Sequence, residues 1–232
     1  MSGTLPLLDM ADALPEPMVS RLPLAPLDLR VMVEDNVLIE AEDAPQAAAF
    51  ANLCCGLLPL RAGTVKFLGH DWANTPHERA SALRGRIGQV YGANSWISFL
   101  TVEANILLQQ LHHTTVSAAR LRDGAAELSR SFGLPGLPLT RPDELTFEDL
   151  VRASCVRGFI GQPRLIILMS PELERVADLR PALFNALAAA RNRQAATIWL
   201  TLSHIVWNDR SIPATARLRL TEHGLVPGRA LP

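Results

Sequence analysis

Histidine and cysteine are the residues in this chain whose chemistry depends most on spacing. The sequence has 6 histidines and 3 cysteines, and each type includes an adjacent pair, His112-His113 and Cys54-Cys55. Adjacent residues on a helix point about 100° apart, whereas a zinc ion needs three or four converging ligands. The cysteines have neither the spacing of a metal site nor that of a disulfide framework, so we expect small core residues. These residues predict no metal site.

A second kind of chemistry, phosphate binding, is indicated by the stretch 37–69. It has an apolar strand over 37–39, a short turn, and a helix of small and apolar residues from about 47 to 55, followed by Gly56. An outgoing strand over 64–68 completes it. Strand, tight loop and helix form the frame of a P-loop, whose backbone N–H groups hold phosphates.

The sequence that leaves this helix, GLLPLRAGTVKFLGHDW, resembles the one that follows the P-loop in ATP-binding cassette (ABC) ATPases. Counting back from Gly56 places the family motif GxxGxGKST on residues 41–49. The resemblance puts Ala41, Ala44 and Gln46 at the loop glycines, Ala47 at the phosphate-binding lysine, and Ala48 at the hydroxyl that would hold Mg²⁺. The frame of this Walker A motif is kept, and its chemical residues are replaced.

The replacements argue against nucleotide binding. An alanine at a loop position of positive φ costs about 1–2 kcal/mol. Glu42 and Asp43 would lie beside a polyanion, and like charges 4 Å apart repel by about 4 kcal/mol at an effective dielectric of 20. We therefore expect no cofactor: neither ATP nor Mg²⁺ should bind. On this stretch alone, an ordinary alanine-rich helix after a strand is an equally good interpretation.

The strand at 86–91 and the helix that begins at residue 101 resemble the segment around the family's Q-loop. The glutamine that senses Mg²⁺ and the attacking water falls on Gly92. Between the two elements lie Trp96, Ile97 and Phe99, in a segment that in the family faces a transmembrane subunit. If exposed, these three form a partner-docking patch; the alternative, three core residues of a buried loop, has equal weight.

The family's signature falls on Thr146, Phe147, Glu148 and Asp149. In the family, serine and glycine amides there clamp the γ-phosphate bound to the opposite subunit. Here Phe147 fills the space that a backbone must approach, and the two acids add negative charge. The residues by themselves predict a helix start, with Thr146 as the cap and acids in the first turn.

The run GQPRLIILMSPE resembles the Walker B strand, with Met169 in place of the Mg²⁺-binding aspartate and Ser170 in place of the catalytic glutamate. Methionine has no oxygen for a hard cation, and loss of a positioned base typically lowers the rate by about 10²–10⁴-fold. Rescue by Glu172 is the alternative. His204 matches the switch histidine and is the one retained residue, for which we expect a structural hydrogen bond.

The resemblance covers about 27–226 and implies one α/β domain with the P-loop NTPase-like, three-layer fold of ABC ATPases. The core and a small N-terminal antiparallel β-subdomain would occupy about 27–100 and 161–227, and a helical subdomain about 101–160. Residues 1–26 read as an irregular lead-in with at most one edge strand. A hydrophobic content of 48% and 19% charged residues are typical of a folded domain.

Charge and hydropathy restrict the partners and the location. The net charge of −1 gives no electrostatic case for nucleic acid or an anionic membrane surface. No apolar run is long enough to span a bilayer, and no signal peptide is visible. We expect a cytoplasmic protein, or one held at the inner face of the cytoplasmic membrane by its partners.

ABC cassettes work in pairs, with each ATP between one subunit's P-loop and the other's signature, and both halves are replaced here. The resemblance therefore implies a pseudo-ATPase: a catalytically dead subunit with a structural or regulatory role in an ABC-type membrane transport complex. Its partners would be transmembrane subunits and either a second ABC ATPase or another copy of itself. The alternatives are a divergent but active ATPase and a free-standing soluble regulator.

Overall fold

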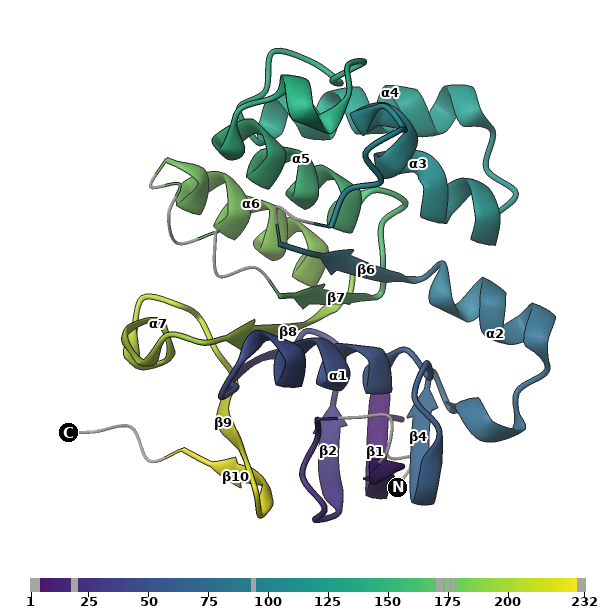
Figure 1. Cartoon of the computed structure of the whole chain (residues 1–232), viewed down its shortest axis with the longest axis vertical. Helices are drawn as coiled ribbons and strands as arrows, with labels where there is room; N and C mark the ends of the chain where they lie inside the picture. The colour runs from purple at the N-terminus through teal and green to yellow at the C-terminus, as the bar shows by residue number, and fades with distance from the viewer. Residues whose placement is uncertain are drawn as a thin grey trace. The chain divides into compact units, whose positions relative to one another are not determined.

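The computed structural model describes residues 5–17, 21–92, 95–169, 173, 176 and 178–228. The chain forms two compact units, one from residues 1–80 and 194–232 and the other from residues 81–193 (Figure 1). The second unit contains the helical segment expected over 101–160. It extends beyond that segment because two strands and a further helix also belong to it.

An antiparallel sheet in the first unit has the order β2-β1-β4-β5. The strands are β1 (Leu8–Pro15), β2 (Leu27–Val31), β4 (Leu60–Phe67) and β5 (His70–Asp71). The antiparallel subdomain is thus confirmed, but the description of 1–26 as an irregular lead-in is wrong, because β1 pairs with both β2 and β4. A bulge after Met10, with Asp12 at φ 47°, breaks the alternation of buried and exposed residues that would reveal the strand.

The parallel strands of the first unit carry the phosphate-loop frame. β3 (Asn36–Glu40) lies between β8 (Ala196–Thr201) and β9 (Ala216–Thr221) and is parallel to both, while β10 (Gly224–Pro227) pairs antiparallel with β9. The register sets Glu40 opposite Thr201 on one side and opposite Arg219 on the other. The helices α1 (Ala44–Cys54) and α7 (His204–Asn208) follow β3 and β8.

The second unit combines a parallel strand pair with four helices. The strands are β6 (Ile87–Val90) and β7 (Leu165–Leu168); the helices are α3 (Val102–His113), α4 (Ala118–Ser131), α5 (Phe147–Phe159) and α6 (Leu179–Asn192). The short helix α2 (His77–Arg84) begins in the first unit and ends in the second. The helical segment expected over about 101–160 is confirmed by α3, α4 and α5. Across the described residues, no helix is long and apolar enough to cross a bilayer.

Strand β6 is held by contacts with the helices α5 and α3. Gly88 and Gly158 allow β6 and α5 to approach: a Cβ atom at Gly88 would lie 1.9 Å from the carbonyl oxygen of Gly158. Two side-chain amides of α3 bond to backbone carbonyls of the strand and of the turn before it. Gln109 Nε2 donates to the oxygen of Ile87 at 2.8 Å, and Gln110 Nε2 donates to that of Gly85 at 3.0 Å.

Candidate functional site

The loop between β3 and α1 satisfies several of its own backbone donors. Asp43 is the N-cap of α1: its Oδ1 accepts from the Gln46 N–H at 2.7 Å, and its carbonyl oxygen accepts from the Ala47 N–H at 3.0 Å. The Gln46 side chain returns to the loop, since its Oε1 accepts from the Glu42 N–H at 2.9 Å. Pro45 has no N–H. The N–H groups of Glu42, Gln46 and Ala47, which could otherwise hold a phosphate at this helix N-terminus, are therefore bonded within the loop.

The backbone of this loop differs from the expected path. The helix begins at Ala44, not near residue 47, because Asp43 caps it and Pro45 suits its first turn. None of residues 41–49 has a positive φ. The expected strain of alanine at glycine positions is therefore not incurred, and this part of the prediction is wrong. Ala47, at the lysine position, is buried, while Ala48 is exposed and offers only a methyl group.

Carboxylates dominate the charge at this end of α1. Glu40, Glu42 and Asp43 occur within four residues. Arg21 lies 3.7 Å from Asp43, but both side chains are well exposed, so solvent screens the pair and it contributes little. A polyanion at this helix N-terminus would approach carboxylates, and no lysine or arginine of the loop itself opposes them.

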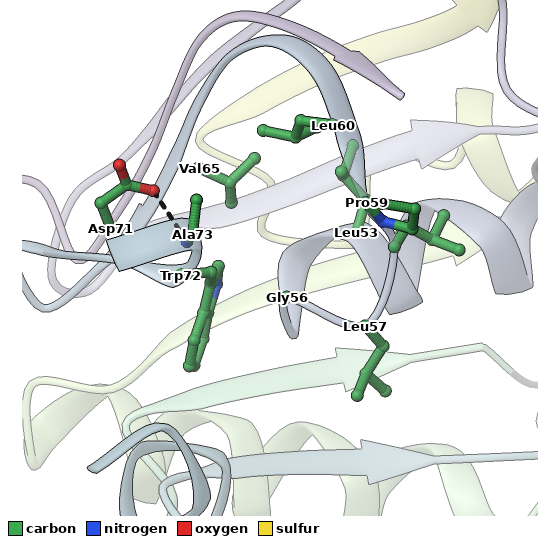
Figure 2. Close-up of a pocket in the computed structure, with 10 residues that line it drawn as sticks. Leu53, Gly56, Leu57, Pro59, Leu60, Val65, Asp71, Trp72 and Ala73 are labelled. Atoms are coloured by element: carbon green, nitrogen blue, oxygen red, sulfur yellow. Dashed lines mark hydrogen bonds between the residues drawn. The ribbon is translucent and has the colours of Figure 1, made fainter. Parts of the chain in front are cut away.

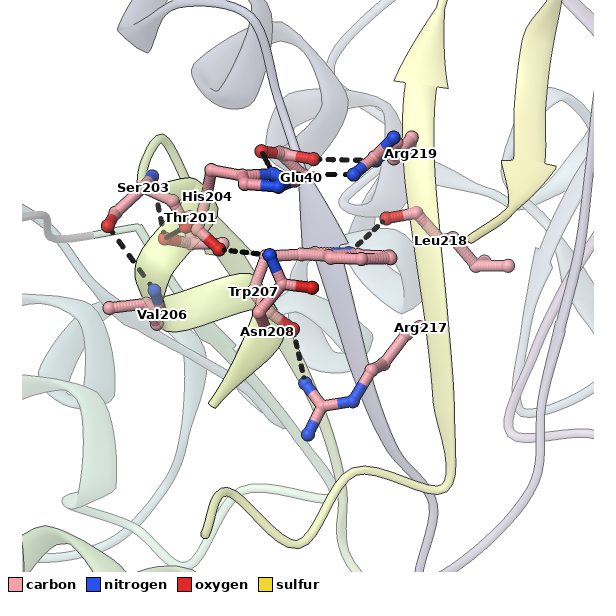
Figure 3. Close-up of polar contacts among 10 residues, drawn as sticks. All are labelled: Glu40, Thr201, Ser203, His204, Val206, Trp207, Asn208, Arg217, Leu218 and Arg219. Carbon is pink, nitrogen blue, oxygen red and sulfur yellow. Dashed lines mark hydrogen bonds and ion pairs between the residues drawn. The ribbon is translucent and has the colours of Figure 1, made fainter. Parts of the chain in front are cut away.

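His204 is placed next to this loop, and its ring is bonded to a carboxylate. Its Nδ1 lies 2.9 Å from Glu40 Oε1, and Arg219 Nε lies 2.7 Å from Glu40 Oε2 (Figure 3). The ring stacks on Trp207, with centroids 6.0 Å apart. Glu40 and Arg219 are neighbours only through the β3–β9 register, across most of the chain, so sequence reasoning missed both. The geometry gives His204 the structural hydrogen bond expected for it.

Trp207 packs against the cluster of Glu40, His204 and Arg219 through the last two side chains. Its side chain is fully buried, its Nε1 donates to the Leu218 carbonyl oxygen at 2.9 Å, and the Arg219 guanidinium lies 4.4 Å from the centre of its ring (Figure 3). The Arg217 side chain donates to the Trp207 carbonyl oxygen at 2.7 Å. The cluster is therefore packed as a structural unit, with its charged groups directed to one another.

In the second unit, Gly92 and Met169 follow the carboxyl ends of neighbouring parallel strands. Val90 lies opposite Leu168 in the register, and the Met169 N–H donates to the Val90 carbonyl oxygen at 2.9 Å. A glycine and a methionine supply no oxygen ligand or base from their side chains. Ser170, at the position of the catalytic glutamate, and Glu172 lie outside the described residues.

The residues at the signature position begin helix α5. Thr146 is its N-cap, and its Oγ1 accepts from the Asp149 N–H at 3.2 Å. Glu148 and Asp149 lie in the first turn, where the helix dipole favours acids. Phe147 is half-buried. This confirms the helix start that the residues themselves predict.

The segment expected to dock a partner divides into buried supports and one exposed side chain. Arg157, buried on α5, donates from Nη1 to the Ser95 carbonyl oxygen at 2.8 Å, and its guanidinium lies over the rings of Tyr91 and Trp96. Burial lowers the pKa of Arg157 to about 10, so it remains charged at neutral pH. Trp96 is only partly exposed and acts here as a support.

Buried Asn105 holds the following turn. Its Oδ1 accepts from the Ile97 N–H at 2.9 Å, and its Nδ2 donates to the carbonyl oxygens of Ile97 and Thr101 at 3.1 and 2.9 Å. Phe99, between these anchors, is 75% exposed. Of the three predicted docking residues, only Phe99 presents its side chain to solvent. Ile97 is half-buried, so neither sequence interpretation holds for the whole patch.

The Arg152–Asp178 pair joins α5 to the start of α6. Arg152 Nη2 lies 2.8 and 2.7 Å from the two carboxylate oxygens, and its Nη1 donates to the Phe132 carbonyl oxygen at 2.9 Å. The hydrogen bond from Arg152 lowers the pKa of Asp178 below its usual value. Because the carboxylate is exposed and the pair is screened, we expect a modest contribution to stability.

We expect Asp178→Asn to lower the melting temperature at neutral pH. The folded pKa is below the unfolded value of about 3.9, so the stabilisation is present above that pH and disappears as the pH falls through the folded pKa. Thermal unfolding from neutral to acidic pH should show the two melting curves converging in acid. Asp123→Asn, at an exposed acid of α4, is the control; a difference that persists in acid would contradict this assignment.

A cavity of the first unit lies at the other end of α1. It has a volume of about 220 Å³ and is lined mainly by apolar side chains, among them Leu53, Leu57, Val65 and Trp72 (Figure 2). Trp72 Nε1 donates to the Cys54 carbonyl oxygen at 3.1 Å, and Asp71 Oδ1 accepts from the Ala73 N–H. Its polar groups are thus bonded to protein, and it has no chemistry for phosphate.

No group of three or more His, Cys, Asp or Glu side chains within the described ranges is arranged to hold a metal ion. The adjacent His112 and His113 contact each other edge to face, and His113 Nδ1 lies 2.7 Å from Ser81 Oγ. The cysteines Cys54, Cys55 and Cys155 are buried thiols. Burial raises the pKa of the Cys155 thiol to about 12, which makes it a poor nucleophile at neutral pH.

Comparison with known proteins identifies the fold. The post-hydrolysis ATP-binding cassette MJ0796, bound to ADP and Pi in a dimer, aligns with a TM-score of 0.79 at 14% identity, over 97% of this chain and 99% of that one. CbiO1 from Clostridium perfringens, part of the ABC transporter complex cbiONQ, aligns with a TM-score of 0.73 at 13% identity, over 95% and 87% of the two chains. The chain therefore has the ABC ATPase fold.

Sequence comparison gives a more distant relationship. The phosphonates import ATP-binding protein PhnC of Anaeromyxobacter dehalogenans (strain 2CP-C) is 27% identical over 180 residues, which cover 71% of this chain. The match spans 35% of that relative's length. No protein-family model matches the chain.

Proposed function

We propose that this chain, which has the ABC ATPase fold, is a subunit that neither binds nor hydrolyses ATP and has a structural or regulatory role in a membrane transport complex. The observation that carries this proposal is the closed loop before α1. Asp43 and Gln46 take up the N–H groups of Gln46, Ala47 and Glu42, and Pro45 supplies none. A phosphate would have to compete with these bonds for the three N–H groups.

The energetic balance supports the same conclusion. Removing an N-cap interaction costs about 1 kcal/mol, and each carboxylate about 4 Å from a phosphate charge adds repulsion of about 4 kcal/mol at an effective dielectric of 20. Glu40 is bonded to His204 and Arg219, so these two side chains are directed to protein. Binding energy from a lysine is missing, because the matching position is the buried Ala47.

The role in transport is supported by the relatives and by one surface. Similar chains are described as a phosphonate-import ATP-binding protein and as part of the cbiONQ transporter complex. In this chain, Phe99 is held exposed by the buried side chain of Asn105. A large, preorganised apolar side chain is typical of an interface anchor. We propose a transmembrane subunit as the partner of this surface.

Thermal unfolding with Mg-ATP tests the loss of nucleotide binding. A ligand at 100 times its Kd adds about 2.7 kcal/mol to stability, which for a chain of this size corresponds to a rise of about 5–10 °C in melting temperature. We expect no shift at millimolar Mg-ATP, whereas an intact cassette measured in parallel should shift by several degrees.

Ala48→Trp provides the matched control for this measurement. Ala48 is exposed at the first turns of α1, so the larger side chain should fold while obstructing the phosphate position. A saturable shift with the natural chain would contradict the proposal. If the variant removed the shift, ATP would be binding at this loop; if the shift persisted, ATP would be binding elsewhere. Phosphate release that is lost in Glu172→Gln would contradict the absence of hydrolysis.

A further inference from the structure

The cavity at the carboxyl end of α1 is lined almost entirely by apolar side chains. Its volume is about 220 Å³. Its walls come from three segments of the first unit: the end of α1 with the loop that follows it, β4, and the short 3₁₀-helix η2 (Trp72–Asn74) after β5. The side chains are those of leucine, proline, valine, alanine and tryptophan, and Asp71 is the one lining residue that can carry a charge.

The polar groups at this wall already have partners within the protein. The Asp71 carboxylate accepts from the Ala73 N–H at 3.2 Å and from Asn74 Nδ2 at 2.8 Å, and Figure 2 shows it directed to the Ala73 backbone. Trp72 Nε1 donates to the Cys54 carbonyl oxygen at 3.1 Å. Ions are therefore poor ligands. An anion would meet no cation among the lining residues, and a cation would have to compete with the two donors on Asp71.

Trp72 forms a wall of the cavity that is held in place before any ligand binds. Its ring stacks on that of Phe67, with centroids 5.9 Å apart and planes within 7° of each other. The backbone of Gly56 lies against the indole, since a Cβ atom there would be 2.3 Å from Trp72 Cγ. The Gly56 N–H donates to the Leu53 carbonyl oxygen at 3.0 Å, which fixes the loop. Because these groups are already ordered, a ligand loses little affinity to the ordering of the protein.

The cavity runs from an exposed rim to a buried floor. Leu57 is 54% exposed, and Pro59 and Ala73 are also exposed, so a ligand can enter between them. Leu53 and Val65 are buried. An apolar cavity of about 150 Å³ can hold benzene, so the volume of about 220 Å³ is sufficient for one aromatic ring with a small substituent, or for two fused rings.

We propose that this cavity binds a small, neutral aromatic molecule, of a size between benzene and indole, against the Trp72 ring. Aromatic rings gain from offset-stacked or edge-to-face contacts in addition to the burial of their surface. Binding here is independent of the proposed function, because the cavity and the loop before α1 lie at opposite ends of that helix. The 11 residues of α1 span about 16 Å.

Thermal unfolding with toluene and with indole tests whether the site exists. We expect each probe to raise the melting temperature by a few degrees in a saturable manner. Benzoate and benzylammonium, which carry a charge on the same ring, should bind at least about tenfold more weakly than toluene. Phenol should bind about two- to tenfold more tightly than cyclohexanol, which has a similar size and the same hydroxyl but no aromatic ring.

Methyl NMR locates the bound ligand without any substitution. The ring current of bound toluene should shift the methyl resonances of Leu57 and Val65, which line the cavity. The methyl resonances of Leu24, an exposed leucine that does not line it, should stay unchanged. Shifts at Leu24 as large as those at Val65 would place the ligand elsewhere and overturn the proposal.

Two variants with matched controls test the position of the site. Ala73→Trp should fill the cavity from its exposed rim and weaken toluene binding at least about tenfold. Ala48→Trp, at an exposed alanine near the other end of α1, should leave the Kd unchanged. Leu57→Glu places a carboxylate at the rim and should also weaken binding, whereas Leu24→Glu should not. Thermal unfolding without ligand checks that each variant is folded.

The outcomes are distinguishable from those for the proposed function, which is tested with Mg-ATP alone. The absence of a saturable shift with both probes, or equal weakening by Ala73→Trp and Ala48→Trp, overturns this proposal and leaves the proposed function unaffected. Tighter binding of N-acetylphenylalaninamide than of toluene would assign the cavity to a side chain of a partner protein and overturn the free ligand. Saturable binding that is lost only in the two rim variants, together with shifts at Val65, supports the proposal.

Discussion

Replacing Gly88 with alanine should destabilise the second unit by about 3 kcal/mol or more, at the upper end of the range for overpacked cores. The added Cβ would lie 1.9 Å from the Gly158 carbonyl oxygen and 2.8 Å from Pro163 Cγ. The nearest of these atoms belongs to the backbone of α5, so a change of side-chain rotamer cannot relieve the contact. The helix or the strand would have to move.

Urea and thermal unfolding measure this effect, and two other glycines provide controls. A loss of 3 kcal/mol corresponds to a fall of about 6–12 °C in melting temperature for a chain of this size. A Cβ at Gly136 would meet no atom within 4 Å, so Gly136→Ala should change little. Gly124 lies within α4, where alanine should raise stability by about 0.5–1 kcal/mol. Equal stabilities for Gly88→Ala and Gly136→Ala would refute the close approach of β6 and α5.

Trp207→Ala should cost about 3–5 kcal/mol, the usual range for removing a large buried aromatic side chain. Trp207 is fully buried, and His204 and Arg219 both pack on its ring. Removing the ring leaves a cavity and also leaves the Leu218 carbonyl oxygen without its indole donor. The positions of Glu40, His204 and Arg219 depend on this ring, so α7 should loosen as well.

Two variants separate packing from hydrogen bonding in this cluster. Trp207→Phe keeps most of the ring volume and loses the indole N–H, so we expect an intermediate loss of about 1–3 kcal/mol from the unpaired carbonyl. His204→Ala removes a half-exposed side chain and should cost less than about 1 kcal/mol. Urea unfolding ranks the three variants. A His204→Ala loss equal to that of Trp207→Ala would show that the polar contacts, and not the buried ring, hold the cluster.

The elements with uninterrupted patterns could be predicted from the sequence. The apolar run Leu165–Leu168 is buried along its whole length, as expected for a strand of a parallel sheet. Helix α5 begins where the sequence predicts because Thr146 supplies a local cap. Such signals lie within a few residues of one another, so they can be recognised without knowledge of the rest of the fold.

Strand β1 could not be predicted, because its bulge breaks the period of two. The chain can accommodate this bulge only because Gly63 faces it: a Cβ there would lie 2.0 Å from the Asp12 carbonyl oxygen. The sequence does not reveal that these two residues meet. The start of α1 differs from the prediction for another reason: the family motif places the helix near residue 47, whereas the cap Asp43 and Pro45 in the first turn start it at Ala44.

The sequence predicts where the candidate site lies along the chain but not which contacts its residues make. The sequence identified the loop residues 41–49 and His204, but Glu40, Arg219 and Trp207 join them only through strand pairing. Similarly, Asn105 on α3 and Arg157 on α5 fix the segment around Phe99, but the sequence does not reveal that these helices contact it. Contacts between residues that are far apart in the chain leave no local pattern in the sequence.

The side-chain amides of Gln109 and Gln110 also affect which backbone groups at β6 are open to another chain. Gln109 and Gln110 bond to the carbonyl groups of Ile87 and Gly85, which an incoming strand from another chain would otherwise need. Strand addition at a sheet edge is a common first step in aggregation. Leucine at position 109 would leave the Ile87 carbonyl of β6 without this donor, so we expect the edge to be more open to strand addition.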